Sequence, residues 1–268
     1  MSPPPSDDDD TTPAVPAATV MLARDEPGGI EVFVMRRTAR AAFAPDMYVF
    51  PGGKVDAGDS ANELAPFCAG LGDDQASSAL GLERGGLAYW VAAVRECFEE
   101  AGVLLARHRD GGPPVFDEDD RHAVHGGTLS LADLCRRHDL VLDLSAIRYI
   151  AHWVTPVGET PRRFDTRFFL AAAPDDQEGV HDDVETVHSQ WVRPGPALAE
   201  GDAGRLALMP PTRACLRLLA EHATVEAALA AADAAGRPPR IQPKLRRGDD
   251  GRIASVSLPG DSDYDTLG

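Results

Sequence analysis

The hydrophobic and polar positions of the 268-residue chain follow two periods, one typical of strands and one of helices. Short apolar runs bounded by turn residues predict strands, and the first two are joined by DEPGG as a hairpin. The predicted strands cover 18–23, 30–36, 47–50, 147–156, 162–173 and 185–194. The predicted helices cover 87–101, 130–137, a segment from 212 onward, and 225–235 before Gly236. The mixture predicts an α/β protein.

The composition divides the chain into three parts. Residues 1–15 are rich in Pro and Asp and cannot bury apolar surface, so we expect a disordered acidic tail. Residues 16–236 carry the predicted strands and helices and form one domain, in which the small, polar segment 61–86 resembles an insertion. Residues 237–268 contain Pro, Arg and one strand-like run, and we expect this extension to pack on the same domain.

Charge and cysteine content exclude several classes of protein. Hydrophobic residues make up 43% and charged residues 26%, as in ordinary globular domains. The net charge of −17 disfavours binding to a nucleic-acid backbone. The four cysteines form no CxxC pair, so we expect reduced thiols in a cytoplasmic protein. The chain has neither a signal-peptide pattern nor a long apolar run, so we expect no membrane partner.

The predicted helix 87–101 gathers three carboxylates on one face. A helix turns by about 100° per residue, so if the angle of Glu96 around the helix axis is set to zero, Glu99 lies at roughly −60° and Glu100 at roughly +40°. The opposite face is apolar, with Val94 and Phe98, and would anchor the helix on the core. Like charges at these spacings repel, so a compensating cation is expected. A solvated acidic helix face is the alternative that this pattern alone leaves open.

A glycine-rich turn upstream favours a metal site over a solvated face. Pro51, Gly52 and Gly53 follow a predicted strand, and Asp59 comes six residues after Gly53. This segment offers backbone carbonyls and a further carboxylate beside the helix. Such oxygen ligands suit Mg²⁺ or Mn²⁺, which keep bound waters and also bind phosphates.

The two segments together resemble the Nudix box, G-x5-E-x7-R-E-U-x-E-E-x-G-U. Gly53-x5-Asp59 matches its first half apart from Asp in place of Glu, and RECFEEAGV from Arg95 matches every position of its second half. Residues 60–94 number 35 where the box has seven, which places an insertion within the box. With FAPDMYVFPGGKVDAGD, HWVTP and RRFDTRFFLA, the divided box resembles the coenzyme A diphosphatase-like branch over roughly residues 17–220.

The resemblance implies a fold and a set of metal ligands. The fold would be a Nudix-type α/β/α sandwich with a mixed sheet, the insertion inside the box and C-terminal helices. Glu99, Glu100 and Glu96 would hold Mg²⁺ or Mn²⁺ together with the Gly52 carbonyl. Glu96 is also the candidate general base, and Arg95 would hold the carboxylates in orientation.

Candidate substrate-binding residues lie outside the box. Arg37 with Phe43 matches the segment that the family associates with coenzyme A. Alternate strand residues point to opposite faces, so at most one of Arg162 and Arg163 faces the site, and Arg163 is the candidate. Trp153 could stack on an adenine, with packing in the core as the alternative.

The implied activity is metal-dependent hydrolysis of a diphosphate linkage in a small nucleotide derivative. Coenzyme A or an acyl derivative is the first expectation, and NADH, ADP-ribose or an oxidised nucleotide is the alternative. A non-catalytic Nudix-like module that senses a nucleotide or binds a protein is a rival of another class. The three clustered carboxylates argue against that rival, and a homodimer is compatible with the sequence.

Overall fold

The computed structural model describes residues 13–39, 44–160, 162–182, 186–248 and 250–267 of the chain. Most of the predicted acidic tail and Phe43 therefore lie outside the described residues. The first strand, β1, begins at Val15, the last residue assigned to that tail. Among the described residues, no helix is both long and apolar enough to cross a membrane.

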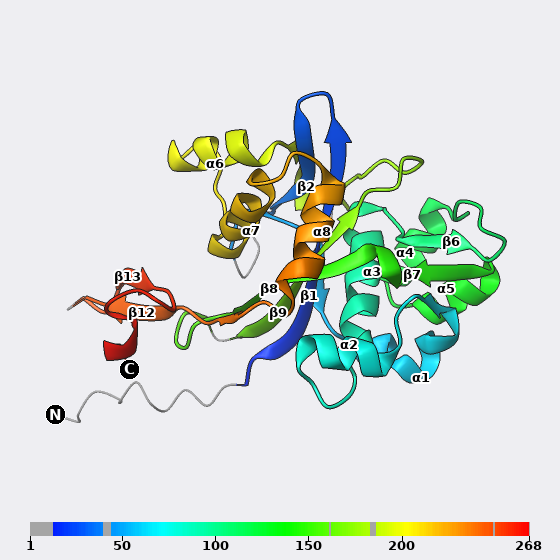
Figure 1. The fold of residues 1–268 in the computed structure, drawn as a ribbon, viewed down its shortest axis with the longest axis horizontal. Helices are drawn as coiled ribbons and strands as arrows, with labels where there is room; N and C mark the ends of the chain where they lie inside the picture. The colour runs from blue at the N-terminus through cyan, green and yellow to red at the C-terminus, as the bar shows by residue number, and fades with distance from the viewer. Residues whose placement is uncertain (1–12, 40–43, 161, 183–185, 249, 268) are drawn as a thin grey trace.

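A mixed sheet forms the centre of the molecule (Figure 1). Its path is β10-β2-β1-β9-β8-β11, with β3 paired to β2 and β4 paired to β1. β1 is antiparallel to β2 and β4 but parallel to β9, which pairs Val15 with Phe164. The strands are β1 (Val15–Glu26), β2 (Gly29–Arg37), β3 (Tyr48–Val49), β4 (Gly52–Lys54), β8 (Ile147–Val154), β9 (Phe164–Ala172), β10 (Thr186–Val192) and β11 (Arg240–Ile241).

Helices cover the two faces of the sheet and bury separate parts of the core. On one face α3 (Leu87–Ala101) packs against alternate residues of β1 and β2, including Leu22 and Phe33. The other alternate residues, including Met21 and Val32, pack with α7 (Pro210–Ala220) and α8 (Val225–Ala235). Because successive side chains of a strand point to opposite faces, each of these strands contributes residues to both cores. The predicted α/β/α sandwich with a mixed sheet is confirmed.

The segment predicted as an insertion forms two short helices that support α3. α1 (Ala61–Leu64) and α2 (Asp73–Leu80) bury Leu64, Ala76 and Leu80 in the same core as α3. The Gly86 N–H donates to Ser77 Oγ at 2.9 Å, which ties α2 to the residue before α3. This segment is therefore part of the core rather than a polar addition.

Further elements flank α3 on the side away from α7 and α8. The helices are α4 (Glu118–His125) and α5 (Leu131–Arg137), and the strands of a small sheet are β5 (Cys68–Ala69), β6 (Ala106–His108) and β7 (Leu140–Asp143). α5 begins after Ser130, as its capping pattern predicts, because the Ser130 hydroxyl accepts from the Asp133 N–H. α4 and the small sheet had no strong sequence signal.

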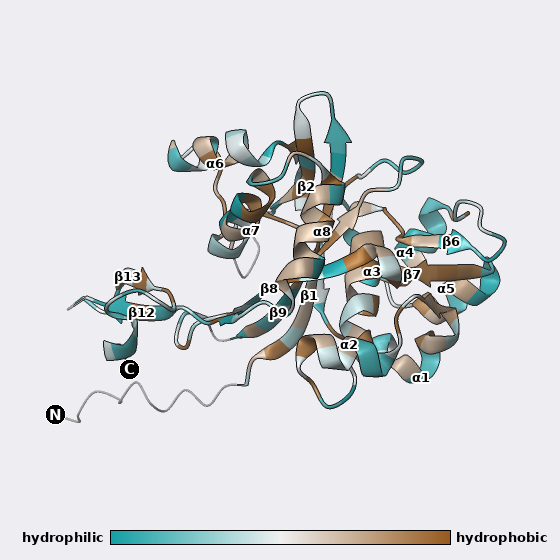
Figure 2. Ribbon diagram, viewed as in Figure 1, coloured by the Kyte–Doolittle hydropathy of each residue, from teal (hydrophilic) through white to brown (hydrophobic). Residues whose placement is uncertain are grey.

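The C-terminal residues do not form one packed extension. β11 joins the central sheet beside β8, whereas β12 (Lys244–Arg247) and β13 (Ile253–Ser257) form a separate hairpin (Figure 1). Arg247 Nη2 donates to the carbonyl of Gly158 in the loop between β8 and β9. α6 (Pro194–Asp202) precedes α7. Figure 2 shows mainly hydrophilic residues along β12 and apolar residues where the helices meet the sheet.

Candidate active site

The three carboxylates of α3 are buried together near the end of the helix. Glu96, Glu99 and Glu100 are 8%, 9% and 6% exposed. α3 ends at Gly102, whose φ of +68° is a left-handed conformation that favours glycine, and its N–H donates to the Phe98 carbonyl at 3.0 Å. The alternative of a solvated acidic face is therefore wrong.

Arg95 lies between these carboxylates and a fourth one from the upstream turn. Its Nε donates to Asp59 Oδ1 at 2.8 Å, and Asp59 is only 1% exposed. Arg95 Nη1 donates to Glu96 Oε1 at 2.8 Å and to both oxygens of Glu99 at 3.2 Å. Nη2 donates to the Lys54 carbonyl at 2.8 Å. One guanidinium thus fixes the positions of three carboxylates, as expected for an orienting residue.

Burial changes the acidity of this cluster. Burial raises the pKa of Glu96 to about 7, although the charge of Arg95 opposes the change. It also raises the pKa of Glu99, again against Arg95. Burial alone would lower the pKa of Arg95, but the hydrogen bond to Asp59 and the charge of Glu96 outweigh it and raise that pKa. Burial therefore disfavours the charged forms of Glu96 and Glu99 more than Arg95 favours them.

The Gly52 backbone faces the carboxylates. Its N–H donates to Glu100 Oε2 at 2.8 Å. The neighbouring Pro51 carbonyl accepts from the Val20 N–H of β1 at 2.9 Å. Because successive residues of a strand turn their polar groups to opposite sides, the N–H and C=O of Gly52 both point away from β1. The Gly52 carbonyl, the predicted metal ligand, therefore lies on the same side as Glu100.

Close packing explains the second glycine of the turn. A Cβ atom added at Gly53 would lie 2.5 Å from Glu96 Oε1 and 2.6 Å from Glu96 Cδ. Real Cβ atoms do not approach other atoms so closely. The position of the Glu96 carboxylate against β4 therefore depends on the absence of a side chain at residue 53.

A buried arginine of α4 fixes the end of α3 and was missed in the sequence. Arg121 is 5% exposed and donates to the carbonyls of Glu99 at 3.0 Å, Glu100 at 3.1 Å and Val180 at 2.9 Å. These bonds satisfy carbonyls in the last turn of the helix, which have no partner within it. The available signal was Asp117, whose side chain caps α4.

The residues of the site match a divalent metal in their chemistry. In the part of the chain that the structure describes, no three His, Cys, Asp or Glu side chains are arranged to hold a metal ion as they stand. Three buried carboxylates, those of Asp59, Glu96 and Glu99, nevertheless share one guanidinium, and the carboxylate of Glu100 accepts from the Gly52 N–H beside them. Rotation of the glutamate side chains would present carboxylate oxygens to a cation beside Gly52.

The structure separates the predicted substrate-binding residues. Arg37 follows Phe33 and Met35 at alternate positions of β2, so it lies on the α3 side of the sheet. Arg163, 8% exposed, precedes β9, and its Nε donates to the Thr155 carbonyl at 3.1 Å. Trp153 is 6% exposed in the core beneath α7 and α8, across the sheet from the carboxylates. The prediction that Trp153 stacks on an adenine is therefore wrong, because the indole packs in the core.

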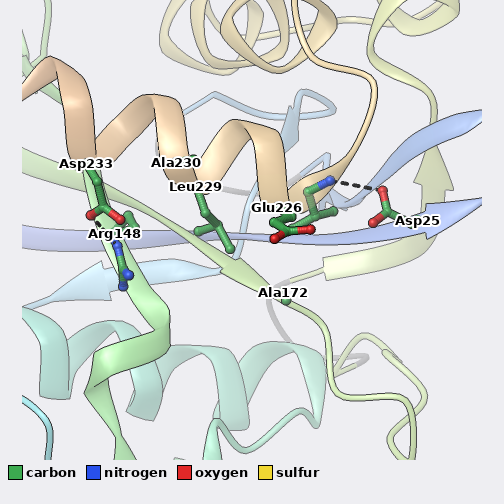
Figure 3. A pocket seen from close by; sticks show the side chains of 8 residues that line it. Asp25, Arg148, Ala172, Glu226, Leu229, Ala230 and Asp233 are labelled. Carbon is green, nitrogen blue, oxygen red and sulfur yellow. Dashed lines mark hydrogen bonds and ion pairs between the residues drawn. The ribbon is translucent and has the colours of Figure 1, made fainter.

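A surface hollow beside α8 lies away from the carboxylates. It has a volume of about 460 Å³ and lies beside α8, lined by Arg148, Ala172, Leu229 and Asp233 among others (Figure 3). Ala172 follows Phe168 and Leu170 at alternate positions of β9, on the face that packs against α7 and α8. This hollow is therefore separate from the carboxylate site.

Comparison with solved structures defines the class of protein. A NUDIX hydrolase from Alicyclobacillus acidocaldarius matches with a TM-score of 0.70 and 30% sequence identity. The match covers 82% of this chain and 97% of that one. The fold and the buried carboxylate helix are therefore those of a Nudix protein.

Comparison with sequence families narrows the class. The model of the NUDT19 Nudix domain matches residues 72–218, and the chain belongs to this family. The human protein called acyl-coenzyme A diphosphatase NUDT19 is 31% identical over 233 residues, covering 74% of this chain and 62% of that protein. The Gallus gallus protein of the same name is 28% identical over 246 residues, covering 73% and 65%. The chain thus spans slightly less than two thirds of the length of these relatives.

Proposed function

We propose that this protein hydrolyses the diphosphate linkage of coenzyme A or an acyl-coenzyme A. The observation that carries the proposal is the buried cluster of Glu96, Glu99 and Glu100, held by Arg95 against Gly52 and Gly53. The similarity to proteins named acyl-coenzyme A diphosphatases supports this substrate over other nucleotide diphosphates.

The carboxylates and the Gly52 carbonyl would hold the metal, Mg²⁺ or Mn²⁺. A bound divalent ion lowers the pKa of a water molecule and neutralises charge on the diphosphate. Glu96, which lies against Gly53, would accept the proton of the attacking water. Arg95 keeps Glu96 and Glu99 in place through its hydrogen bonds. Water adds to one phosphorus and the bridging P–O bond breaks, which yields phosphopantetheine and adenosine 3′,5′-bisphosphate.

The sheet beside the carboxylates offers positive charge for the phosphates. Arg37 lies on the α3 side of β2, near the turn that leads to β3. A guanidinium pairs well with phosphate oxygens, and a protein with a net charge of −17 needs such local attraction for a polyanion. Arg37 is therefore assigned to the diphosphate end of the substrate, with Arg163 as the second candidate.

A substrate panel tests the proposal. Coenzyme A, an acyl-coenzyme A, NADH and ADP-ribose would be incubated with Mg²⁺ or Mn²⁺, and both products of each reaction identified by mass spectrometry. We expect the highest kcat/KM on a coenzyme A compound, with phosphopantetheine or its acyl form as one product. A clear preference for NADH or ADP-ribose would contradict the substrate assignment. Glu100→Gln should lower these rates. Its control is Glu83→Gln, at an exposed position before α3.

A further inference from the structure

A second group of buried polar side chains lies two strands away from the carboxylates. Gly53 of β4 is opposite Ala18 of β1, and Ala18 is opposite Arg167 of β9. Arg167 is in turn opposite His152 of β8. Adjacent strands are about 4.8 Å apart, so the Arg167 backbone lies roughly 10 Å from Gly53, against which Glu96 packs. Ala18 is buried in the core beneath α3, so this row faces α3.

The side chains of Arg167 and His152 share one carboxylate, that of Asp165. Arg167 is 5% exposed and His152 is 7% exposed, whereas 27% of the Asp165 side chain is exposed. Asp165 Oδ1 accepts from Arg167 Nη1 and lies 2.7 Å from His152 Nε2. The Tyr89 ring of α3 lies 5.4 Å from the Arg167 guanidinium carbon. Asp165 therefore separates two buried nitrogen-bearing side chains from solvent.

Two buried donors in this region have no acceptor: one belongs to Arg167, and the other to Tyr149 of β8, which is opposite Phe169, two residues along β9 from Arg167. Within the described residues, Arg167 Nε and the hydroxyl of Tyr149 make no hydrogen bond. Burial raises the pKa of Tyr149 to about 12, so its hydroxyl keeps its proton at neutral pH. Buried donors are nearly always paired in proteins, and each unpaired donor costs about 1–3 kcal/mol. Oxygen acceptors from a bound group could satisfy these two donors, which have no acceptor among the described residues.

We infer that Arg167, Tyr149 and His152 form a subsite for a phosphate group of the substrate, and that Asp165 occupies it until the ligand binds. A phosphate offers several acceptor oxygens and pairs with the fork of an arginine. The identity of this phosphate rests on the proposed function: coenzyme A carries one at the 3′ position, away from its diphosphate. The subsite would receive that group while the diphosphate lies at the carboxylates.

Binding of nucleotides that the enzyme does not cleave tests the subsite separately from hydrolysis. Adenosine 3′,5′-bisphosphate and AMP, which lacks the 3′-phosphate, would be titrated calorimetrically into the full chain at fixed Mg²⁺. We expect the bisphosphate to bind about 10- to 150-fold more tightly, as for one charged contact of roughly 1.5–3 kcal/mol. Equal affinities for the two nucleotides would overturn the subsite.

Two substitutions should act in opposite directions. Arg167→Gln should remove the preference for the bisphosphate and leave AMP affinity nearly unchanged. Asp165→Asn should increase the affinity for the bisphosphate, because the competing carboxylate is gone. If Arg167 and Asp165 had only a structural role, both variants would bind the bisphosphate more weakly or as well as the wild type. That result would refute the inference. Arg148→Gln, which removes an arginine of the neighbouring strand β8 that is paired to Asp233, is the matched control.

Further measurements separate the remaining explanations. Thermal unfolding checks that each variant folds. If Arg167→Gln does not fold, Arg167→Lys replaces it: this variant keeps the charge but loses the forked guanidinium, so it should show only part of the wild-type preference for the bisphosphate. Inorganic phosphate that competes as strongly as the bisphosphate would mean a site for free phosphate, which overturns the substrate assignment. A wild-type protein that prefers the bisphosphate but does not cleave coenzyme A would contradict the proposed function and leave the subsite standing.

Discussion

Gly53→Ala should damage catalysis while leaving the fold intact. The new Cβ would lie 2.5 Å from Glu96 Oε1, whereas an ordinary contact is roughly 3.5 Å. Something must therefore move by about 1 Å, and the flexible end of Glu96 can move more easily than the paired β4 backbone. A displacement of about 1 Å in a reacting group can cost about 10²-fold in rate. We expect a loss in kcat of that size.

Stability should change little or increase in the same variant. Gly53 does not have a positive φ, so alanine is compatible with its backbone. Replacing such a glycine stabilises a protein by about 0.4–1 kcal/mol through the unfolded chain, which offsets the local crowding.

The assay combines initial rates on coenzyme A with thermal unfolding. Gly58→Ala is the matched control, because a Cβ at this position, five residues after Gly53, meets nothing within 4 Å. Wild-type turnover in a folded Gly53→Ala protein would show that the position of Glu96 against β4 does not matter for the reaction.

Three other predictions follow from the site and its surroundings. Glu100→Gln should lower turnover with Mg²⁺ by at least about 10²-fold without unfolding the protein, and an unchanged rate would rule out its role as a ligand. Arg121→Met should lower the free energy of unfolding in urea by at least about 2 kcal/mol, because two buried carbonyls and one partly buried carbonyl lose their donor. The exposed control Arg109→Met should cost no more than about 1 kcal/mol, and equal losses would contradict this reasoning. Burial would raise the pKa of Asp165, but the hydrogen bond with His152 and the Arg167 charge outweigh it and lower the pKa below its ordinary 3.8. The stabilisation by the Asp165 carboxylate is present above pH 3.8 and is lost as the pH falls through the pKa of the folded state. The stability of the wild type should therefore fall more steeply below about pH 4 than that of Asp165→Asn. Parallel curves of stability against pH for the two proteins would contradict this prediction.

The carboxylate helix could be predicted because its evidence is local. The 3.6-residue period places Glu96, Glu99 and Glu100 together whatever α3 packs against, and Gly102 marks its end. The Pro51-Gly52-Gly53 motif is also recognisable within a few residues, although Gly52 and Gly53 lie in β4 rather than in the predicted turn, because they pair with β1. The same reasoning predicted the hairpin of β1 and β2 and the capped start of α5.

Other features depend on which segments meet in space. Arg121 lies in a polar helix, and nothing near it in the sequence indicates that it binds the end of α3. Trp153 and His152 are neighbours in β8, but only the packing of helices on both faces decides that one lies beneath α7 and the other beneath α3. Burial of the acidic face likewise required Arg95 to meet Asp59 across the insertion.

The parallel pairing of β1 with β9 has a consequence for how the chain folds. It joins residue 15 to residue 164, so the central pair of strands closes a loop that contains α3 and the whole divided box. Contacts between such distant segments slow folding, because the entropy of a large loop is lost before the contact forms. We expect refolding to be slow for a protein with this much helix. A chain interrupted before β9 would hold the complete Nudix box, yet β1, against which β4 is aligned, would lack its parallel neighbour.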